Sequence, residues 1–345
     1  MAHAKSNGYQ ASDATSSLDA LRELYGNTFA VVKSMALKAP WTSAIAERHS
    51  TNQRRRRNSV PDSHPGSRST PSKKLAPGDA AAPADEAEAA VYALTPVSRL
   101  LIGAGNQGHM MSMLLHPNFI TPFFRISDWL QRELPGPCIF KHTHGRSLWE
   151  MADDDAAFNT VVNDGMASDS IFTMDILVRE HGEVFQGISS LVDVAGGNGT
   201  AAQAIARAFP EVKCSVMDLA HVVAEAPGGT GVEFITGDMF ESVPPANAVF
   251  LKGDNDCVKI LGNCKKAIPT RDKGEKVIIM DIVVGTGPSD QKHRDVQILY
   301  DAYIMFINGA ERDEQEWKKL FLEAGFSDYK IMPIMGFRSI IEVYP

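Results

Sequence analysis

Three aspartates follow three successive hydrophobic segments in the second half of this 345-residue chain. Asp193 lies in a valine-rich segment that leads into a glycine turn, and Asp218 and Asp238 come at or just after the next two segments, at residues 212–218 and 232–235. Hydrophobic segments that alternate with helical ones are typical of a parallel sheet, whose strands end at one shared edge. We therefore expect the three carboxylates to point into one crevice.

The turn after the first strand indicates a ligand held close to the backbone, because small residues leave room there for close approach. Its residues are Ala195, Gly196, Gly197 and Gly199. The spacing up to Ala202 also fits a nicotinamide dinucleotide site. Asp193 favours a cationic cofactor instead, since a carboxylate repels a pyrophosphate and attracts an ammonium or sulfonium group. The sequence thus predicts S-adenosylmethionine, with a nicotinamide cofactor and a reductase activity as the alternative.

The spacing also predicts a role for each acid. We expect Asp193 near the amino-acid part of the cofactor, and Asp218, followed by Leu219, at the ribose hydroxyls. Asp238 offers a carboxylate to the exocyclic amine of adenine. Met239 offers a flat, polarisable surface to the adenine ring.

Composition indicates a globular protein of about two domains, with 44% hydrophobic and 22% charged residues. The N-terminus shows no signal-peptide pattern and no segment is long and apolar enough to span a membrane, so a cytoplasmic location is expected. The four cysteines have no C-x-x-C spacing. We expect free thiols in a reducing compartment and no metal site.

A basic segment interrupts this acidic chain. Residues 48–74 hold eight Lys or Arg and a single acid, a net charge of +7, whereas the whole chain carries −8. Because the segment is rich in Ser and Pro and short of large apolar residues, we expect disorder at 48–90. Arg54–Arg57 is interpreted as a solvated charge run and not as a nucleic-acid site.

Four regions follow from these patterns. We expect an N-terminal dimerisation helix within 1–47, the disordered segment at 48–90, a helical substrate and dimer region at 91–187, and a doubly wound, Rossmann-like α/β domain at 188–345. Apolar spacing predicts helices at 18–39, 110–133 and 148–179. The last two hydrophobic segments, 328–332 and 338–343, are expected to form an antiparallel pair on the sheet.

The chain resembles the plant phenolic O-methyltransferases, the family of caffeic acid, flavonoid and acetylserotonin O-methyltransferases. The matching phrases are Tyr92–Leu101, Phe158–Met166, Leu191–Gly199, Met217–Leu219, Gly237–Phe240, Leu251–Lys252, Asn308–Arg312, Glu316–Trp317 and Ala324–Phe326. The resemblance implies a seven-stranded S-adenosylmethionine-binding domain, an N-terminal winged-helix domain that exchanges helices in a homodimer, and an aromatic substrate with a free hydroxyl. It also implies that Lys252 contributes to the cofactor site.

The chain departs from this family where the catalytic base should be. In the family, a phrase of the type Trp-x-x-His-Asp-Trp follows the Leu-Lys, and its histidine removes the phenolic proton; here Gly253–Cys257 follows Lys252 at once. The resemblance assigns Asp281 and Glu311 to the acids that steady this histidine. Two further departures are Ala195 in place of the first glycine of the turn and the basic segment in place of the winged helix.

Candidate residues for an aromatic pocket are Met166, Met305, Phe158 and Trp129, together with Phe123 and Phe124. No other histidine offers a clear substitute for the missing base. The sequence therefore predicts an S-adenosylmethionine-dependent O-methyltransferase of impaired activity. The alternative is a non-catalytic, cofactor-binding subunit in a homodimer, or in a heterodimer with an intact relative.

Overall fold

The computed structural model describes residues 30, 100–102, 106–131, 137–252, 258–268 and 274–345. The chain divides into two compact units, Met1–Leu115 and His116–Pro345, which we describe separately. In the first unit, the described residues form helix α5, Gly108–Leu114. The expected helix at 18–39, apart from Ala30, the segment at 48–90 and the loop at 253–257 lie outside the described residues.

A single helix at 110–133 is not what forms. After α5 come α6 (Pro117–Ile120), a 3-10 turn at Thr121–Arg125 and α7 (Ile126–Leu130). Proline explains the interruptions. Pro117 opens α6 and restricts the residue before it, so His116 has extended backbone with ψ 143°, and Pro122 lies at the start of the 3-10 turn.

The expected helix at 148–179 is also divided. Helices α8 (Ile139–His144) and α9 (Leu148–Asp154) precede the long α10 (Ala156–Glu180), and a short 3-10 turn follows at Gly182–Phe185. Asp155 separates α9 from α10 because its carboxylate caps α10, accepting the backbone N–H groups of Ala157 (3.0 Å) and Phe158 (3.1 Å). Sequence periodicity missed this cap.

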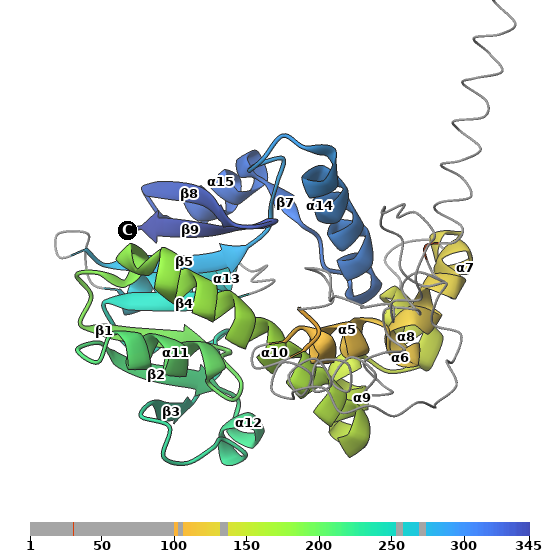
Figure 1. The fold of residues 1–345 in the computed structure, drawn as a ribbon, viewed down its shortest axis with the longest axis horizontal. Coiled ribbons are helices and arrows are strands. Elements are labelled where there is room, and N and C mark those ends of the chain that lie inside the picture. Colours follow the sequence, from red (N-terminus) through yellow and green to blue (C-terminus); the bar gives the residue numbers. More distant parts are fainter. Residues whose placement is uncertain (1–29, 31–99, 103–105, 132–136, 253–257, 269–273) are drawn as a thin grey trace, which may run out of the picture. The chain divides into compact units, whose positions relative to one another are not determined.

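The doubly wound sheet is confirmed. Its seven strands have the order β3-β2-β1-β4-β5-β9-β8 (Figure 1). They are β1 (Ser190–Val194), β2 (Lys213–Asp218), β3 (Glu233–Thr236), β4 (Ala248–Lys252), β5 (Lys276–Asp281), β8 (Asp328–Met335) and β9 (Arg338–Tyr344). The first five are parallel, and β9 runs antiparallel between β5 and β8. The expected terminal antiparallel pair is therefore present.

Helices cover both faces of the sheet. On one face, α10 and α11 (Thr200–Ala208) pack against Leu191, Phe250 and Ile278 (Figure 1). On the other face, α13 (Val258–Ala267) and α15 (Glu314–Glu323) pack against the alternate residues, such as Val192 and Val249. Because the central strands β1, β4 and β5 are buried on both faces, hydrophobic residues continue through them up to the charged residues Asp193, Lys252 and Asp281 near their carboxyl ends.

Smaller elements complete the unit. They are α12 (Ala220–Ala224), α14 (Gln291–Ile304), a 3-10 turn at Met305–Ile307, and a two-stranded sheet of β6 (Val283–Val284) and β7 (Arg312–Asp313). Within the described part of the chain, none of the helices combines the length and the hydrophobicity needed to cross a bilayer.

Candidate cofactor and active site

The turn after β1 has the tight backbone that the sequence indicates. Ala195, Gly197 and Gly199 all lie in the left-handed region, with φ of 54°, 58° and 74°. A side chain there is strained, so Ala195 carries a backbone cost that glycine in the same place would avoid. A Cβ on Gly197 would meet no atom within 4 Å, so the turn is open on that side. Room against a bare backbone is what a closely bound nucleotide cofactor requires.

Asp193 lies underneath this turn. Its side chain points to the face covered by α10 and α11, the residue is only 2% exposed, and Oδ2 accepts the N–H of Ala202 (3.3 Å). A Cβ on Gly196 would come within 2.6 Å of the carboxyl carbon of Asp193, so this carboxylate makes glycine necessary at 196. Burial raises the pKa of Asp193 to about 7, and Asp218 adds to the rise, whereas the Ala202 N–H and Lys252 oppose it.

Asp218 connects the end of β2 to the turn. Its Oδ2 accepts the N–H of Gly197 (2.9 Å) and its Oδ1 accepts the N–H of Leu219 (2.7 Å). A carboxylate has about four acceptor positions, so about two remain for a ligand. Two acceptor positions beside an open glycine turn fit a pair of ribose hydroxyls.

The third acid is held beside the second. The N–H of Gly237 donates to the carbonyl of Asp218 (3.0 Å), and Asp238 Oδ1 accepts the N–H of Phe240 (2.8 Å). Asn263 of α13 donates from Nδ2 to the carbonyl of Met239 (3.0 Å), whose side chain packs against the core. Asn263 is a positioning residue that sequence reasoning missed. The parallel register brings all three acids to one edge of the sheet.

Lys252, the last residue of β4, belongs to a buried ion cluster. Its Nζ donates to Asp169 Oδ2 (2.8 Å) and to the hydroxyl of Ser170 (2.9 Å). Arg338, at the start of β9, donates from Nη1 to the other oxygen of Asp169 (3.2 Å) and also hydrogen-bonds the hydroxyl of Tyr300. We call Lys252, Asp169, Ser170, Arg338 and Tyr300 the Lys252 cluster.

The cluster has shifted protonation equilibria. Burial opposes the charge on Asp169, yet Arg338 and Lys252 hold the pKa of this carboxyl below its usual value. Burial lowers the pKa of Lys252 although Asp169 favours its charged form, and burial raises the pKa of Tyr300. Sequence reasoning named only Lys252. One signal for Asp169 was available, because it lies at helical spacing from Phe158 and Val162 on the buried side of α10, where an acid needs a partner.

The candidate catalytic acids lie at the ends of neighbouring segments. Asp281 ends β5, is buried, and accepts the N–H of Ile282 at Oδ1 (2.7 Å). Glu311 is half-buried, and its N–H donates to Asp301 of α14 (2.8 Å). Val283 pairs with Arg312 in the β6–β7 sheet, so the segment after Asp281 runs beside the segment after Glu311.

The candidate pocket residues have different surroundings. Phe158 is buried in an aromatic cluster against His116 (5.4 Å between ring centroids) and Phe119 (5.7 Å). Met166 is 46% exposed on α10, and Met305 is half-buried in the 3-10 turn after α14. Trp129 of α7 donates from Nε1 to the carbonyl of Pro137 (2.8 Å). Met166 and Met305 are therefore partly exposed, whereas Phe158 is buried.

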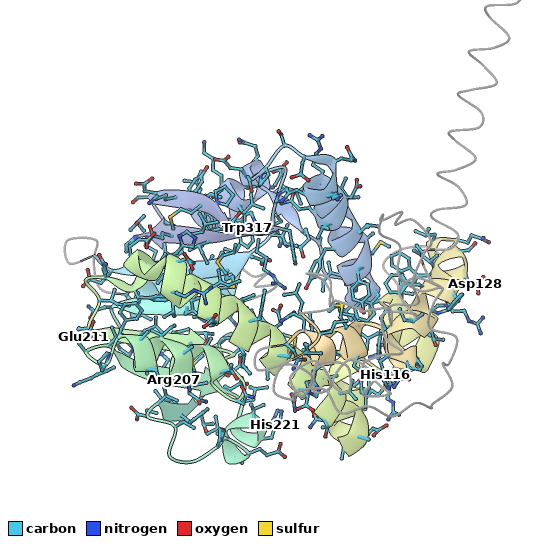
Figure 2. The ribbon with its side chains drawn as sticks, in the orientation of Figure 1. His116, Asp128, Arg207, Glu211, His221 and Trp317 are labelled. Carbon is cyan, nitrogen blue, oxygen red and sulfur yellow. The ribbon has the colours of Figure 1, made fainter. Side chains whose placement is uncertain are left out.

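Several histidines have structural partners. His116 caps α6 through Nδ1, His144 hydrogen-bonds the carbonyl of Asn118 (2.9 Å), and His293 hydrogen-bonds the carbonyl of Thr286 (2.8 Å). His221 is exposed on α12, away from His116 (Figure 2). Among the described residues, no group of three His, Cys, Asp or Glu is arranged to hold a metal.

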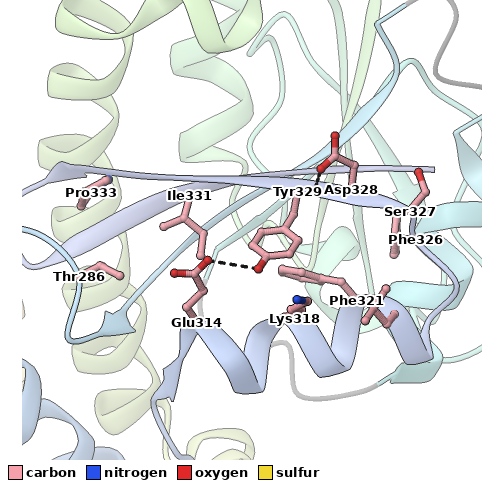
Figure 3. A pocket seen from close by; sticks show the side chains of 11 residues that line it. Thr286, Glu314, Lys318, Phe321, Phe326, Ser327, Asp328, Tyr329, Ile331 and Pro333 are labelled. Atoms are coloured by element: carbon pink, nitrogen blue, oxygen red, sulfur yellow. Dashed lines mark hydrogen bonds between the residues drawn. The ribbon is translucent and has the colours of Figure 1, made fainter.

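A separate hollow of about 550 Å³ lies between α15 and β8 (Figure 3). Phe321, Tyr329 and Ile331 form part of its wall, and the Tyr329 hydroxyl donates to Glu314 Oε1 (3.2 Å). None of the described residues predicted for the cofactor or substrate site lines this hollow.

The strand order and the acids at its carboxyl edge define a nucleotide-cofactor-binding α/β protein of the doubly wound methyltransferase class. The O-methyltransferase domain family matches residues 123–327. O-methyltransferase ZRP4 of Zea mays is 53% identical to this chain over 351 residues, which cover 95% of this chain and 96% of the maize protein. The chain therefore belongs to the plant phenolic O-methyltransferase family, whose methyl donor is S-adenosylmethionine.

Other relatives and solved structures agree. Acetylserotonin O-methyltransferase 1 of Oryza sativa subsp. japonica is 40% identical, with 95% of each chain covered. The structure of CalO1, a methyltransferase in calicheamicin biosynthesis in its SAH-bound form, superposes with a TM-score of 0.70 at 22% identity, covering 95% of this chain and 99% of CalO1. Human N-acetylserotonin methyltransferase in complex with SAM gives 0.58 at 17% identity, covering 70% and 71%. At these identities the two structures show the fold alone.

Proposed function

We propose that this protein transfers a methyl group from S-adenosylmethionine to the hydroxyl of a small aromatic compound, at a rate reduced by the loss of the family's general base. Relatives support the substrate class. Proteins 49–51% identical to this chain are named 5-pentadecatrienyl resorcinol O-methyltransferase in Sorghum bicolor and acetylserotonin O-methyltransferase 2 in Oryza sativa. The acceptor would be a phenol, a flavonoid or an N-acetylserotonin-like indole.

The cofactor supplies a methyl group already activated on a sulfonium. The protein must hold it and align the acceptor. In this proposal Asp218 and Leu219 hold the ribose through the free acceptor positions of the carboxylate, and Asp238 with Met239 binds the adenine. The negative charge of Asp193 beneath the turn favours the cationic end of the cofactor.

Binding of S-adenosylhomocysteine, followed by isothermal titration calorimetry, tests this assignment. Asp218→Ala should weaken binding about tenfold or more, because a charge-assisted hydrogen bond contributes roughly 1.5–3 kcal/mol. Glu211→Ala is the matched control, since it removes an exposed acid near the amino end of the same strand (Figure 2). Equal affinities for the two variants, or tight binding of NADH in place of S-adenosylhomocysteine, would exclude the assignment.

The observation that carries the reduced rate is the sequence after β4, where Gly253–Cys257 stands directly after Lys252. A phenol has a pKa of about 10 and is mostly neutral at pH 7, so a positioned base contributes roughly 10²–10⁴-fold. Asp281 and Glu311 would steady an imidazole, whereas a carboxylate with the ordinary pKa of about 4 is a weak base for a phenol. Met166 and Met305 would line the acceptor pocket, with Phe158 and Trp129 supporting it.

Insertion of a Trp-x-x-His-Asp-Trp phrase between Lys252 and Gly253 tests the missing base. Turnover on a panel of phenols and N-acetylserotonin should rise at least about 10²-fold. The same insertion with alanine in place of the histidine should give no gain. Ordinary turnover by the unmodified chain would contradict the proposal, because another group would then serve as the base.

The acids at the carboxyl edge of the sheet are retained although the family's base is missing. This combination also supports a second candidate function, a non-catalytic subunit paired with an intact relative. We propose the region at 1–47 as the dimerisation element, 48–90 as a disordered segment, 91–187 as the helical substrate region and 188–345 as the cofactor domain of a cytoplasmic protein. Co-expression with an intact relative and measurement of the mass of the purified complex distinguish the candidates. A stable heterodimer whose turnover is unchanged by the histidine insertion in this chain would favour the subunit role.

A further inference from the structure

The Lys252 cluster and the acid beneath the glycine turn share one face of the sheet. Asp193 pairs with Phe250 in the register of β1 and β4, and side chains two residues apart on a strand point to the same face, so Lys252 lies on the face of Asp193. Arg338 has the same relation to Ile340, which packs on this face. Helix α10, which carries Asp169, covers it.

The arrangement of charges within the cluster is asymmetric. Asp169 accepts from two cations, Lys252 at one oxygen and Arg338 at the other. One carboxylate therefore faces two positive groups, of which arginine keeps its proton at all ordinary pH values. The second negative charge that acts on Lys252 comes from Asp193 on the neighbouring strand β1. With both aspartates ionised, the four groups balance to zero.

We propose that Asp169 and Arg338 are positioning residues that fix the Lys252 ammonium on the face shared with Asp193, where it is the counter-charge that favours the ionised form of Asp193 in the cofactor site. This inference rests on the proposed cofactor role of Asp193. It assigns to Lys252 an electrostatic task through its side chain, and it gives Asp169 and Arg338 a function besides packing.

The titration of Asp193 depends on the charged and polar groups that face it. Asp193 faces the Ala202 N–H of α11, Lys252 of β4, and Asp218 and Cys214 of β2. Asp218 opposes the charge of Asp193, and the Cys214 thiol is uncharged near neutral pH because burial raises its pKa to about 11. Lys252 is therefore the cationic side chain that favours ionisation of Asp193.

Lys252 itself faces two acids and one cation. Asp169 and Ser170 come from α10, Arg338 from β9 and Asp193 from β1. If Asp169 is neutralised, Arg338 and burial both disfavour the ammonium of Lys252. Asp169→Asn should consequently act on Asp193 in the same direction as removal of the lysine charge.

The test is the pH dependence of S-adenosylhomocysteine binding by the full-length chain between pH 5.5 and 9. In the wild type, affinity should fall on acidification as Asp193 takes up a proton. Lys252→Met and Asp169→Asn should move this midpoint upward by about one pH unit, which weakens binding at pH 7 up to about tenfold and leaves it within about twofold at pH 9. Lys252→Arg should restore the wild-type midpoint.

Asp175→Asn is the matched control. Asp175 also lies on α10 but forms an exposed ion pair with Arg179 (2.9 Å), so its removal should leave the midpoint unchanged. A loss of affinity that is equal at pH 7 and pH 9 in Lys252→Met would overturn the inference, because a purely structural role or a direct contact with the ligand produces that result. An unmoved midpoint in both variants would overturn it as well.

A second measurement does not involve the cofactor. The pH dependence of urea unfolding, compared between each variant and the same variant carrying Asp193→Asn, isolates the contribution of Asp193, because groups that do not interact with it cancel. The pH range over which this contribution changes should extend about one pH unit higher in Lys252→Met than in the wild type. If the wild type binds no S-adenosylhomocysteine at any pH, the proposed function fails, and this comparison still decides whether Lys252 controls the charge of Asp193. The same pH range in Lys252→Met and in the wild type would then refute the coupling between Lys252 and Asp193.

Discussion

Asp193→Asn should change the way the stability of this protein depends on pH. The carboxyl of Asp193 has its pKa raised by burial from the ordinary value of 3.8 to about 7 in the folded chain. Between these values the folded state holds a proton that the unfolded state has released. The contribution of Asp193 to stability is therefore greatest below pH 3.8 and is lost as pH rises through 7. Asparagine has no proton to lose, so this contribution disappears in the variant.

The magnitude follows from the size of the shift. A rise of about 3 pKa units corresponds to about 4 kcal/mol between full protonation and full ionisation, at about 1.4 kcal/mol per unit. Between pH 5 and pH 8 the part that is lost is about 2–3 kcal/mol. Because Asp193 is 2% exposed, solvent screening does not reduce this figure appreciably. The free energy needed to ionise Asp193 in the folded chain is thus a large share of a typical domain's stability.

Urea unfolding of both proteins at pH 5, 6, 7 and 8 measures this effect. The free energy of unfolding of the variant relative to the wild type should rise by about 2–3 kcal/mol from pH 5 to pH 8, with most of the change below pH 7. Titrating groups that do not interact with Asp193 contribute equally to both proteins and cancel. Asp193→Asn should at the same time weaken S-adenosylhomocysteine binding at pH 8. Parallel stability curves would refute the reasoning, since they would mean that Asp193 does not titrate in this window.

Three further substitutions test the geometry of the fold and the turn. Gly196→Ala places a Cβ 2.6 Å from the Asp193 carboxyl carbon, so we expect about 1–3 kcal/mol of destabilisation by urea unfolding and weaker cofactor binding, whereas Gly228→Ala, with open space around the new Cβ, should be neutral. Ala195→Gly relieves the strain at φ 54°, and calorimetry should show tighter S-adenosylhomocysteine binding with a stability change within about 1 kcal/mol. Gln297→Leu removes the buried amide that donates to the Phe337 carbonyl and accepts the Gly285 N–H, and unfolding should become about 2–4 kcal/mol easier; an unchanged midpoint would show that the surrounding loop re-pairs.

The sheet was predictable because its signals are local. The segment Ser190–Val194, for example, is short, largely hydrophobic and followed by turn residues, and it forms β1. The helices at 110–133 and 148–179 were predicted too long because apolar spacing continues across Pro117 and Asp155, where backbone chemistry ends a helix regardless of the pattern.

The candidate site likewise contains residues that the sequence can locate and residues that it cannot. The acids that follow strands can be located from sequence, because a parallel sheet brings strand ends together whatever the distance along the chain. The partners of Lys252 cannot be found that way. Asp169 is 83 residues away and Arg338 is 86 residues away in the other direction, so only the packing of α10 and β9 on the sheet brings them together. A buried acid on a helix indicates that a partner exists, but it does not identify that partner.

The two acids proposed to steady the missing histidine, Asp281 and Glu311, are held by contacts of their own, which is why restoring the base tests the proposed function. Asp281 is fixed by β5 and by its contact with the N–H of Ile282, and Trp317 of α15 donates to the carbonyl of Ile282 (3.2 Å). Glu311 is fixed by Asp301 of α14 and by the pairing of β6 with β7. All these contacts come from elements after residue 275. An insertion after Lys252 therefore needs to supply only the imidazole and enough chain to reach the two acids, since the surfaces meant to orient it are held independently of that loop.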